Sequence, residues 1–264
     1  MKALCIFLKV TEQGYYKFKK KAESFDYVQN SDEIIVFEKW LEFDKSIGYK
    51  KLALQLLWDY GLIMNHKKVY RIMGELKIRA FQRKKTNHRQ KIDNAQKEYI
   101  YPNILAINFK AIRKYEKLCT DISEFPFEGK TVYLSAVIDL YNNEIVTYKR
   151  SRGHTGKLVL ETIMSLDKTK INDTIYHSDR GGEYRSYRFK KQIEKLKLKG
   201  SMSRAGTPTD NAPIEVFHSM IKTEIQFNNI KSIDELEQKI DEYIFKYNYR
   251  RVQHKLKTPP VYYR

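Results

Sequence analysis

The sequence predicts a mixed α/β sheet with helices on both faces, preceded by a small helical domain. Residues 1–80 repeat apolar residues at helical spacing, whereas residues 117–264 begin with three strand-like segments and then alternate helices with strands. A basic stretch, residues 81–116, lies between them and has the composition of a linker. These patterns predict two folded domains, the second built on a sheet that helices cover.

The helical domain contains one clear pair of helices. In the first, Leu52, Leu56 and the pair Leu57-Trp58 give an apolar face, and Gly61 ends the helix. The second is expected to begin at Asn65, because an Asn side chain can accept a hydrogen bond from a backbone N–H in the first turn. The apolar residues of this second helix recur at helical spacing: Val69, Ile72, Met73 and Leu76.

The outer face of the second helix is basic. It carries Lys67, Lys68 and Arg71, which predicts contact with DNA by a helix-turn-helix-like module. A plain helical hairpin with a solvated basic side is the alternative, and the pattern leaves it open. The basic stretch that follows indicates a linker, or a helix that follows a phosphate backbone.

The second domain is expected to contain its elements in a defined order. The strand KLCTDISEF comes first, and the hairpin after it turns at Tyr141-Asn142-Asn143. Three antiparallel strands followed by alternating helices and strands are typical of a mixed sheet. The later elements are a helix near 155–167, the strand TIYHSD, a helix near 184–196, a short strand near 199–203, and helices near 211–227 and 232–249.

The charge of the chain indicates a polyanionic partner. Lys and Arg number 50 against 32 Asp and Glu, a formal net charge of +18. No stretch approaches the roughly 18 apolar residues of a membrane span, so we expect no membrane partner and a cytoplasmic location. Cys5 and Cys119 lie far apart, which argues against a disulfide framework or a Cys-rich zinc site.

Three acidic residues stand in settings that favour a metal centre. Asp121 lies inside an apolar strand, and Asp179 ends the strand TIYHSD. Glu215 lies one turn into a helix. A lone strand Asp is costly to bury unless it is paired or binds a metal. Carboxylates from two strands and a helix can converge at one edge of a sheet and hold Mg²⁺ or Mn²⁺. Two such ions about 3.5–4 Å apart can clamp a phosphodiester.

The spacing of these acids is the most specific signal. Positions 180 to 214 lie between Asp179 and Glu215, so 214 − 180 + 1 = 35 residues separate them. Lys222 follows Glu215 by seven residues, and seven steps of about 100° return to nearly the same helix face. A lysine on that face can approach a phosphate as a point charge.

Five stretches of the sequence are long and specific. They are TDISEF, VYLSAVIDLYNNEIV, HSDRGGEY, SMSRAGTPTDNAPIEVFHSMIKTE and YNYRRVQHKLKTPPVYYR. They resemble the OrfB-type transposases of the IS-three family of bacterial insertion sequences, which carry a retroviral-integrase-like core. The resemblance runs from about residue 14 to the C-terminus. Leu118 departs from it, because such proteins usually have Trp there.

The resemblance implies a ribonuclease-H-like fold and a DD-35-E active site formed by Asp121, Asp179 and Glu215, with Lys222 as its basic partner. It implies Mg²⁺-dependent cleavage at transposon ends and strand transfer, that is, DNA integration, without a covalent protein–DNA intermediate. The implied partners are double-stranded DNA, both transposon ends and target, and further copies of this chain bound on that DNA. An upstream-frame (OrfA) protein, or a fusion to it, is a further implied partner, and the DNA-bound form is expected at the nucleoid.

Neighbouring residues are secondary candidates. Arg180 and Arg204 are expected to contact phosphate, with simple solvated charge as the alternative. His177 and His218 are expected to orient or pack rather than to react, and Asp210-Asn211 to shape the start of a helix. Two rival classes stay open: a metal nuclease such as a ribonuclease H or junction resolvase, and a non-catalytic DNA-binding regulator.

Overall fold

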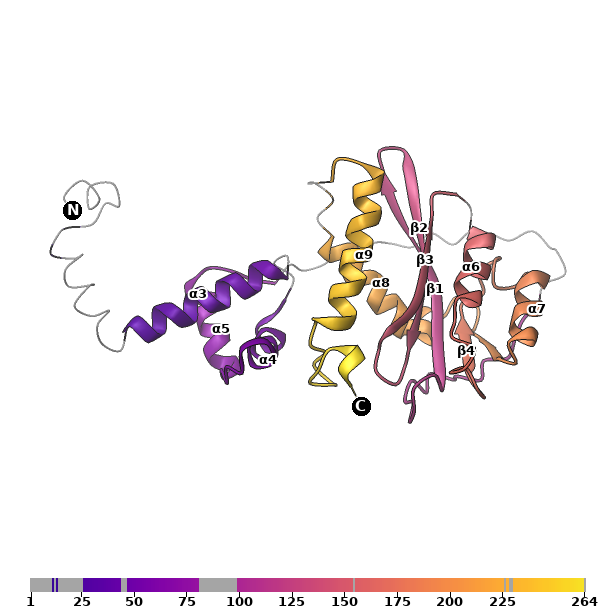
Figure 1. Ribbon diagram of the computed structural model, residues 1–264, viewed down its shortest axis with the longest axis horizontal. Coiled ribbons are helices and arrows are strands. Elements are labelled where there is room, and N and C mark those ends of the chain that lie inside the picture. The colour runs from indigo at the N-terminus through magenta and orange to yellow at the C-terminus, as the bar shows by residue number, and fades with distance from the viewer. Residues whose placement is uncertain are drawn as a thin grey trace. The chain divides into compact units, whose positions relative to one another are not determined.

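The computed structural model describes residues 11, 13, 26–43, 47–80, 99–153, 155–225, 227 and 230–263 (Figure 1). The chain divides into two compact units, Met1–Gln82 and Arg83–Arg264, which we call the N-terminal and the C-terminal unit. Among the helices in these ranges, none combines the length and the apolar character that a membrane crossing requires.

Three described helices form the N-terminal unit: α3 (Asp26–Glu42), α4 (Tyr49–Tyr60) and α5 (His66–Glu75). The predicted end and start signals are confirmed. Gly61 adopts a φ of 65° after α4, where its N–H bonds to the carbonyls of the last turn, and the Asn65 side chain accepts a hydrogen bond from Lys67 N at 2.9 Å.

The apolar face predicted for α4 was too broad. Leu52 and Leu56 are fully buried against α3 and α5, but Leu57 and Trp58 remain 45% and 42% exposed. The reason is a buried polar side chain: Gln55 takes the neighbouring inner position and donates to Asp59 at 3.0 Å.

A five-stranded sheet with the order β3-β2-β1-β4-β5 forms the centre of the C-terminal unit. Strands β1, β2 and β3 pair antiparallel, whereas β4 pairs parallel with both β1 and β5. Their bounds are β1 (Lys117–Phe127), β2 (Lys130–Asp139), β3 (Ile145–Ser151), β4 (Ile175–Ser178) and β5 (Lys199–Met202). The sequence predicted all five strands, among them the β2–β3 hairpin and the short strand near 199–203.

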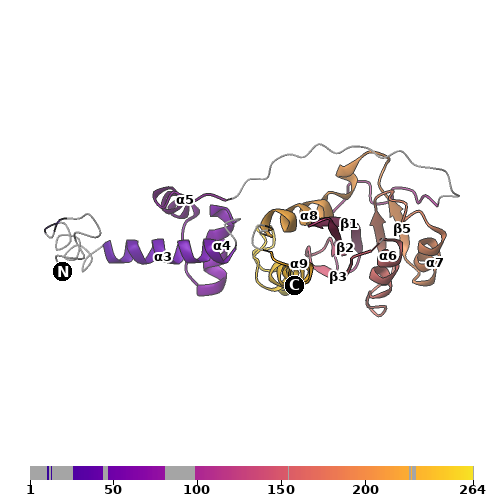
Figure 2. The ribbon, with the colours of Figure 1, turned by 90° about the horizontal axis from the view of Figure 1, so that it is seen from above.

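Helices cover both faces of the sheet, as predicted (Figures 1 and 2). One apolar core joins the sheet to α8 and α9 through residues such as Phe125, Leu134 and Phe217. A second core joins the opposite face to α6 and α7 through Val137 and Phe189. The helix bounds are α6 (Thr155–Met164), α7 (Tyr187–Lys195), α8 (Ala212–Glu224) and α9 (Ile233–Tyr249), with short 3₁₀ turns η1 (Pro208–Asn211) and η3 (Pro260–Tyr262).

Residues 99–116 contain no helix or strand, yet they pack against the C-terminal unit. Leu105 is 1% exposed in the core beneath α8 and α9. The ring of Tyr101 lies so close to Gly200 of β5 that a Cβ there would be 2.7 Å from it. The sequence grouped this stretch with the linker because it shows no strand or helix pattern, but by its packing it is part of the C-terminal unit.

Candidate active site

The parallel pairing of β1 and β4 brings Asp121 beside Asp179. Lys117 pairs with Ile175 and Cys119 with His177, an offset of 58 in both cases. The same offset carried two residues further matches Asp121 with Asp179, at the point where β4 has just ended. Neighbouring strands lie about 4.8 Å apart, so the register sets both carboxylates at one edge of the sheet.

Glu215 reaches the same edge because two residues on its helix face contact β1. Asn211 Nδ2 donates to the Thr120 carbonyl at 3.0 Å, and His218 Nε2 lies 3.3 Å from the Asp121 carbonyl oxygen. Residues four before and three after Glu215 share its side of the helix. The helix therefore presents Glu215 toward the strand that carries Asp121.

Asn211 differs from its expected role. It occupies the N-cap position of α8, but its side chain makes no capping hydrogen bond and instead binds β1. Pro213 lies in the first turn, where its missing N–H costs no helical hydrogen bond.

Burial and neighbouring carboxylates shift the pKa values of Asp121 and Asp179. Burial, and then the charges of Asp179 and Glu215, raise the pKa of Asp121 well above its usual value, although its side chain keeps 23% of its surface exposed. Burial and the nearby Glu183 carboxylate raise the pKa of Asp179. Asp121 and Asp179 therefore both resist ionisation until a positive charge compensates them.

The donor set suits a hard cation. Carboxylate oxygens are the ligands that Mg²⁺ and Mn²⁺ prefer, and a positive ion would relieve the repulsion that raises the pKa of Asp121. Within the ranges that the structure describes, no three His, Cys, Asp or Glu side chains converge closely enough to form a ready-made metal site.

Gly181 leaves space between two acids that face each other. Its N–H donates to Asp179 Oδ1 at 2.9 Å. A Cβ at this position would lie 3.1 Å from Asp179 Oδ1 and 3.3 Å from Glu183 Oε2. The sequence analysis singled out neither Gly181 nor Glu183, whose other oxygen accepts a hydrogen bond from Thr155.

Gly181→Ala should weaken metal binding, because the added methyl group displaces the Asp179 carboxylate. We expect Mn²⁺ affinity, measured by titration calorimetry, to fall by roughly 10- to 100-fold, the usual cost of disturbing a ligand's immediate support. Gly182→Ala is the matched control, since a Cβ there meets nothing within 4 Å. Equal affinities in the two variants would contradict the prediction.

The predicted basic residues of this unit take different positions. Lys222 lies near Asp121, whose pKa it lowers, and its Nζ lies 5.6 Å from the Phe125 ring centroid. Arg180 Nε donates to the Ser203 carbonyl at 2.8 Å. Arg204 holds the buried carboxylate of Asp210 through two side-chain hydrogen bonds of 3.0 and 2.9 Å. Both arginines thus have structural partners in addition to any contact with phosphate.

The two histidines are buried and neutral. Burial lowers the pKa of His177 to about 4 and that of His218 to about 3. His177 lies between the hydroxyls of Ser201 and Ser203, at 2.8 and 3.1 Å. His218 Nε2 lies near the Asp121 backbone carbonyl and, at 3.9 Å, the Asp121 carboxylate, and its ring centroid lies 5.5 Å from the Phe217 ring centroid.

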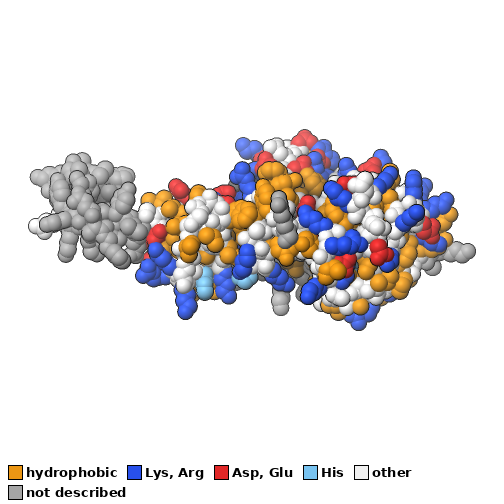
Figure 3. Space-filling view, turned by 60° about the horizontal axis from the view of Figure 1, so that its bottom comes forward, with side chains coloured by type: hydrophobic (Ala, Val, Ile, Leu, Met, Phe, Trp, Pro, Cys, Tyr) orange, Lys and Arg blue, Asp and Glu red, His pale blue; other side chains and the backbone are white. Residues whose placement is uncertain are grey.

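The basic residues of α5 are not equivalent. Lys67 and Arg71 are exposed, and Arg71 lies 3.6 Å from Glu75. Lys68 instead forms an ion pair with the largely buried Asp32 of α3, so it joins two helices of the N-terminal unit. Figure 3 shows Lys and Arg side chains along one edge of this unit and across the visible face of the C-terminal unit.

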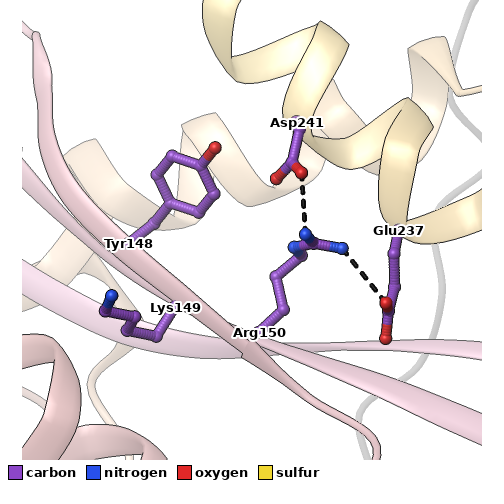
Figure 4. A pocket seen from close by; sticks show the side chains of 5 residues that line it. All are labelled: Tyr148, Lys149, Arg150, Glu237 and Asp241. Carbon is purple, nitrogen blue, oxygen red and sulfur yellow. Dashed lines mark ion pairs between the residues drawn. The ribbon is translucent and has the colours of Figure 1, made fainter.

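A hollow of about 380 Å³ lies between β3 and α9, elements that carry none of the three acids (Figure 4). Arg150 projects into it from β3 and bridges Glu237 and Asp241 of α9 at 3.2 and 2.8 Å. Burial and Asp241 raise the pKa of Tyr148 to about 12. The charge of Arg150 is offset by those of Glu237 and Asp241. The residues of the hollow therefore hold β3 and α9 together.

Both units of the chain match models of known protein families. Models described as an integrase core domain match residues 112–208 and 196–259, and a model described as an HTH-like domain matches residues 31–86. The chain is 37% identical over 222 residues to the InsK protein for insertion sequence element IS150 of Escherichia coli, covering 82% of this chain and 77% of that protein.

The chain is also similar to a second relative and to one solved structure. The chain is 27% identical over 233 residues to transposase InsF for insertion sequence IS3A of Escherichia coli, covering 85% of this chain and 78% of the relative. The catalytic core domain of HTLV-2 integrase, solved in complex with magnesium, superposes with a TM-score of 0.48 at 11% identity, covering 58% of this chain and 99% of that one.

Proposed function

Because this chain belongs to the IS3 family of insertion-sequence transposases and carries an integrase catalytic core, we propose that it cuts DNA at the transposon ends and joins those ends to a target. Asp121, Asp179 and Glu215 are its catalytic residues. The observation that supports this most is the β1–β4 register, which sets Asp121 beside Asp179, while α8 presents Glu215 to the same strand.

The three carboxylates would hold Mg²⁺ or Mn²⁺, as two ions. Bound there, the ions would activate the attacking oxygen and stabilise the leaving oxygen of a phosphodiester. The chain's own residues bind and orient. Lys222 attracts the phosphate beside the acids, and Gly181 fixes the Asp179 carboxylate through its backbone N–H. None of these residues has to form a covalent bond to DNA.

The N-terminal unit supplies DNA binding through α5. Its match to an HTH-like model and the exposed Lys67 and Arg71 support a helix that meets double-stranded DNA. Lys68, Arg180 and Arg204 are further candidate contacts, each with an internal partner as well. The working form would be an oligomer of this chain on DNA, in the cytoplasm at the nucleoid, with an upstream-frame protein or fusion as a further partner.

Lys67→Ala should weaken DNA binding to a similar extent on all sequences, because a phosphate contact carries no sequence information. The slope of log affinity against log salt should decrease by about 1 for this single contact. Fluorescence anisotropy at several salt concentrations measures it. Lys239→Ala on α9, where the lysine pairs with Glu242, is the control that should leave the slope unchanged.

The test of the function is an assay that separates cutting from joining. The chain is incubated with Mg²⁺, DNA that carries the element's ends, and a target plasmid, and the products are resolved by size. Joined products support the proposal. Cut products without joining favour a nuclease of the ribonuclease H or resolvase class, and DNA binding without turnover favours a regulator.

A further inference from the structure

Residues 99–106, which we call the strap, run along β5 beside the candidate site. Tyr99 N–H donates to the Arg185 carbonyl at 3.1 Å, and Met202 N–H of β5 donates to the Pro102 carbonyl at 3.4 Å. The ring of Tyr101 covers Gly200, as described above. The strap therefore follows β5 toward the end at which the acids lie.

The first attachment of the strap is Asn103. Its Nδ2 donates to Asp210 Oδ2 at 2.9 Å, and its Oδ1 accepts from Ala106 N at 2.9 Å, so both ends of the amide are fixed. Asp210 is fully buried and also accepts from the backbone N–H and the guanidinium of Arg204. It directly precedes Asn211, the residue that fastens α8 to β1.

The second attachment is Ser201 of β5. Its hydroxyl oxygen accepts from Ile104 N and Leu105 N at 3.0 and 3.2 Å. The hydroxyl hydrogen is then left for His177 Nδ1 at 2.8 Å, which places the imidazole proton on Nε2, where it can be donated to Ser203 Oγ at 3.1 Å. His177, a residue of β4, lies two residues before Asp179 in the chain.

We propose that the strap positions the catalytic acids and that Asn103 is a positioning residue, which acts through Asp210 on the helix that carries Glu215. The inference rests on the proposed function and deepens it. The strap reaches both catalytic elements through one intermediate residue each. Ser201 of β5 links it to His177 of β4, the strand that ends just before Asp179, and Asp210 of η1 links it to the start of α8, which carries Glu215. The same strap is the part of the C-terminal unit that follows residues 81–98, which lead from the N-terminal unit.

The test compares Asn103→Asp with Asn103→Ala. A carboxylate at position 103 repels Asp210, whereas Ala removes the donor and adds no charge. We expect Asn103→Asp to lower kcat for strand joining and the affinity for Mn²⁺ by roughly 10- to 100-fold, with KM for DNA nearly unchanged. Asn103→Ala should lose less.

Asn108→Ala in the stretch 99–116 is the matched control, since the Asn108 side chain is exposed and accepts a 3.4 Å hydrogen bond from Lys110 N. Wild-type kcat and Mn²⁺ affinity in Asn103→Ala and Asn103→Asp would overturn the proposal, and so would a change in KM alone. Mn²⁺ titration measures metal binding, and hydrogen exchange at the first amides of α8 measures how firmly the helix start is held. Neither measurement requires the chain to join DNA. If the chain never joins DNA but these two measurements follow the expected order, the proposed function fails while the positioning role stands.

Discussion

Asp121→Asn should abolish strand joining and, in the absence of metal, stabilise the fold. The amide keeps the size of the side chain but removes the charge that a cation needs. We expect joining to fall by about 10³-fold or more, which corresponds to about 4 kcal/mol of transition-state stabilisation. Product formation under single-turnover conditions with Mg²⁺ measures it, and full joining by the variant would contradict the proposed function.

The stabilising effect of Asp121→Asn follows from the direction of the pKa shift. Burial and two neighbouring acids raise the pKa of Asp121, so the folded protein holds this proton more tightly than the unfolded chain. That contribution to stability is fully present below the unfolded pKa of about 3.9 and is lost as the pH rises through the folded pKa. The variant should therefore melt at a higher Tm than wild type near neutral pH, and this advantage should shrink toward pH 4. Mn²⁺ should raise the Tm of wild type more than that of the variant.

Arg251→Met should cause the largest loss of stability. Arg251 and Glu224, which are 4% and 7% exposed, form an ion pair that fastens the chain after α9 to the last residue of α8. Removing one member leaves the other as a buried charge, and the usual cost is about 3–5 kcal/mol. Urea unfolding monitored by circular dichroism measures this loss.

Two comparisons make the Arg251 result specific. Adding Glu224→Leu to Arg251→Met removes both charges and should restore much of the stability, because apolar replacement of a whole buried pair is often neutral. Glu242→Gln, which breaks the exposed Lys239–Glu242 pair of α9, should cost no more than about 1 kcal/mol. A loss as large in Glu242→Gln as in Arg251→Met would refute the role of burial.

Local signals made much of the fold predictable from the sequence. Gly61 and Asn65 mark where α4 ends and α5 begins, because each acts on backbone groups only a few residues away. The strands and the helices on both faces follow from apolar periodicity. The register of β1 and β4 supports the convergence of Asp121 and Asp179 at one sheet edge, which their positions in strands suggested.

Contacts between distant residues could not be predicted in this way. Lys68 looks like an exposed basic residue of a helix, but its partner Asp32 lies 36 positions earlier. Asn211 has the residue type and place of an N-cap, yet its side chain binds Thr120, 91 positions away. The strap carries no periodicity at all, since its attachments are single hydrogen bonds to β5 and Asp210. In each case the tertiary partner, and not the local pattern, decides what the side chain does.

The order of synthesis gives the buried Arg251–Glu224 pair a further role. Arg251 is translated after all three acids, and until it has left the ribosome the end of α8 carries a Glu224 charge without its buried partner. Until that point α8, which carries Glu215, is not packed stably against the sheet. A nascent chain therefore carries Asp121, Asp179 and Glu215 before α8 has its buried ion pair.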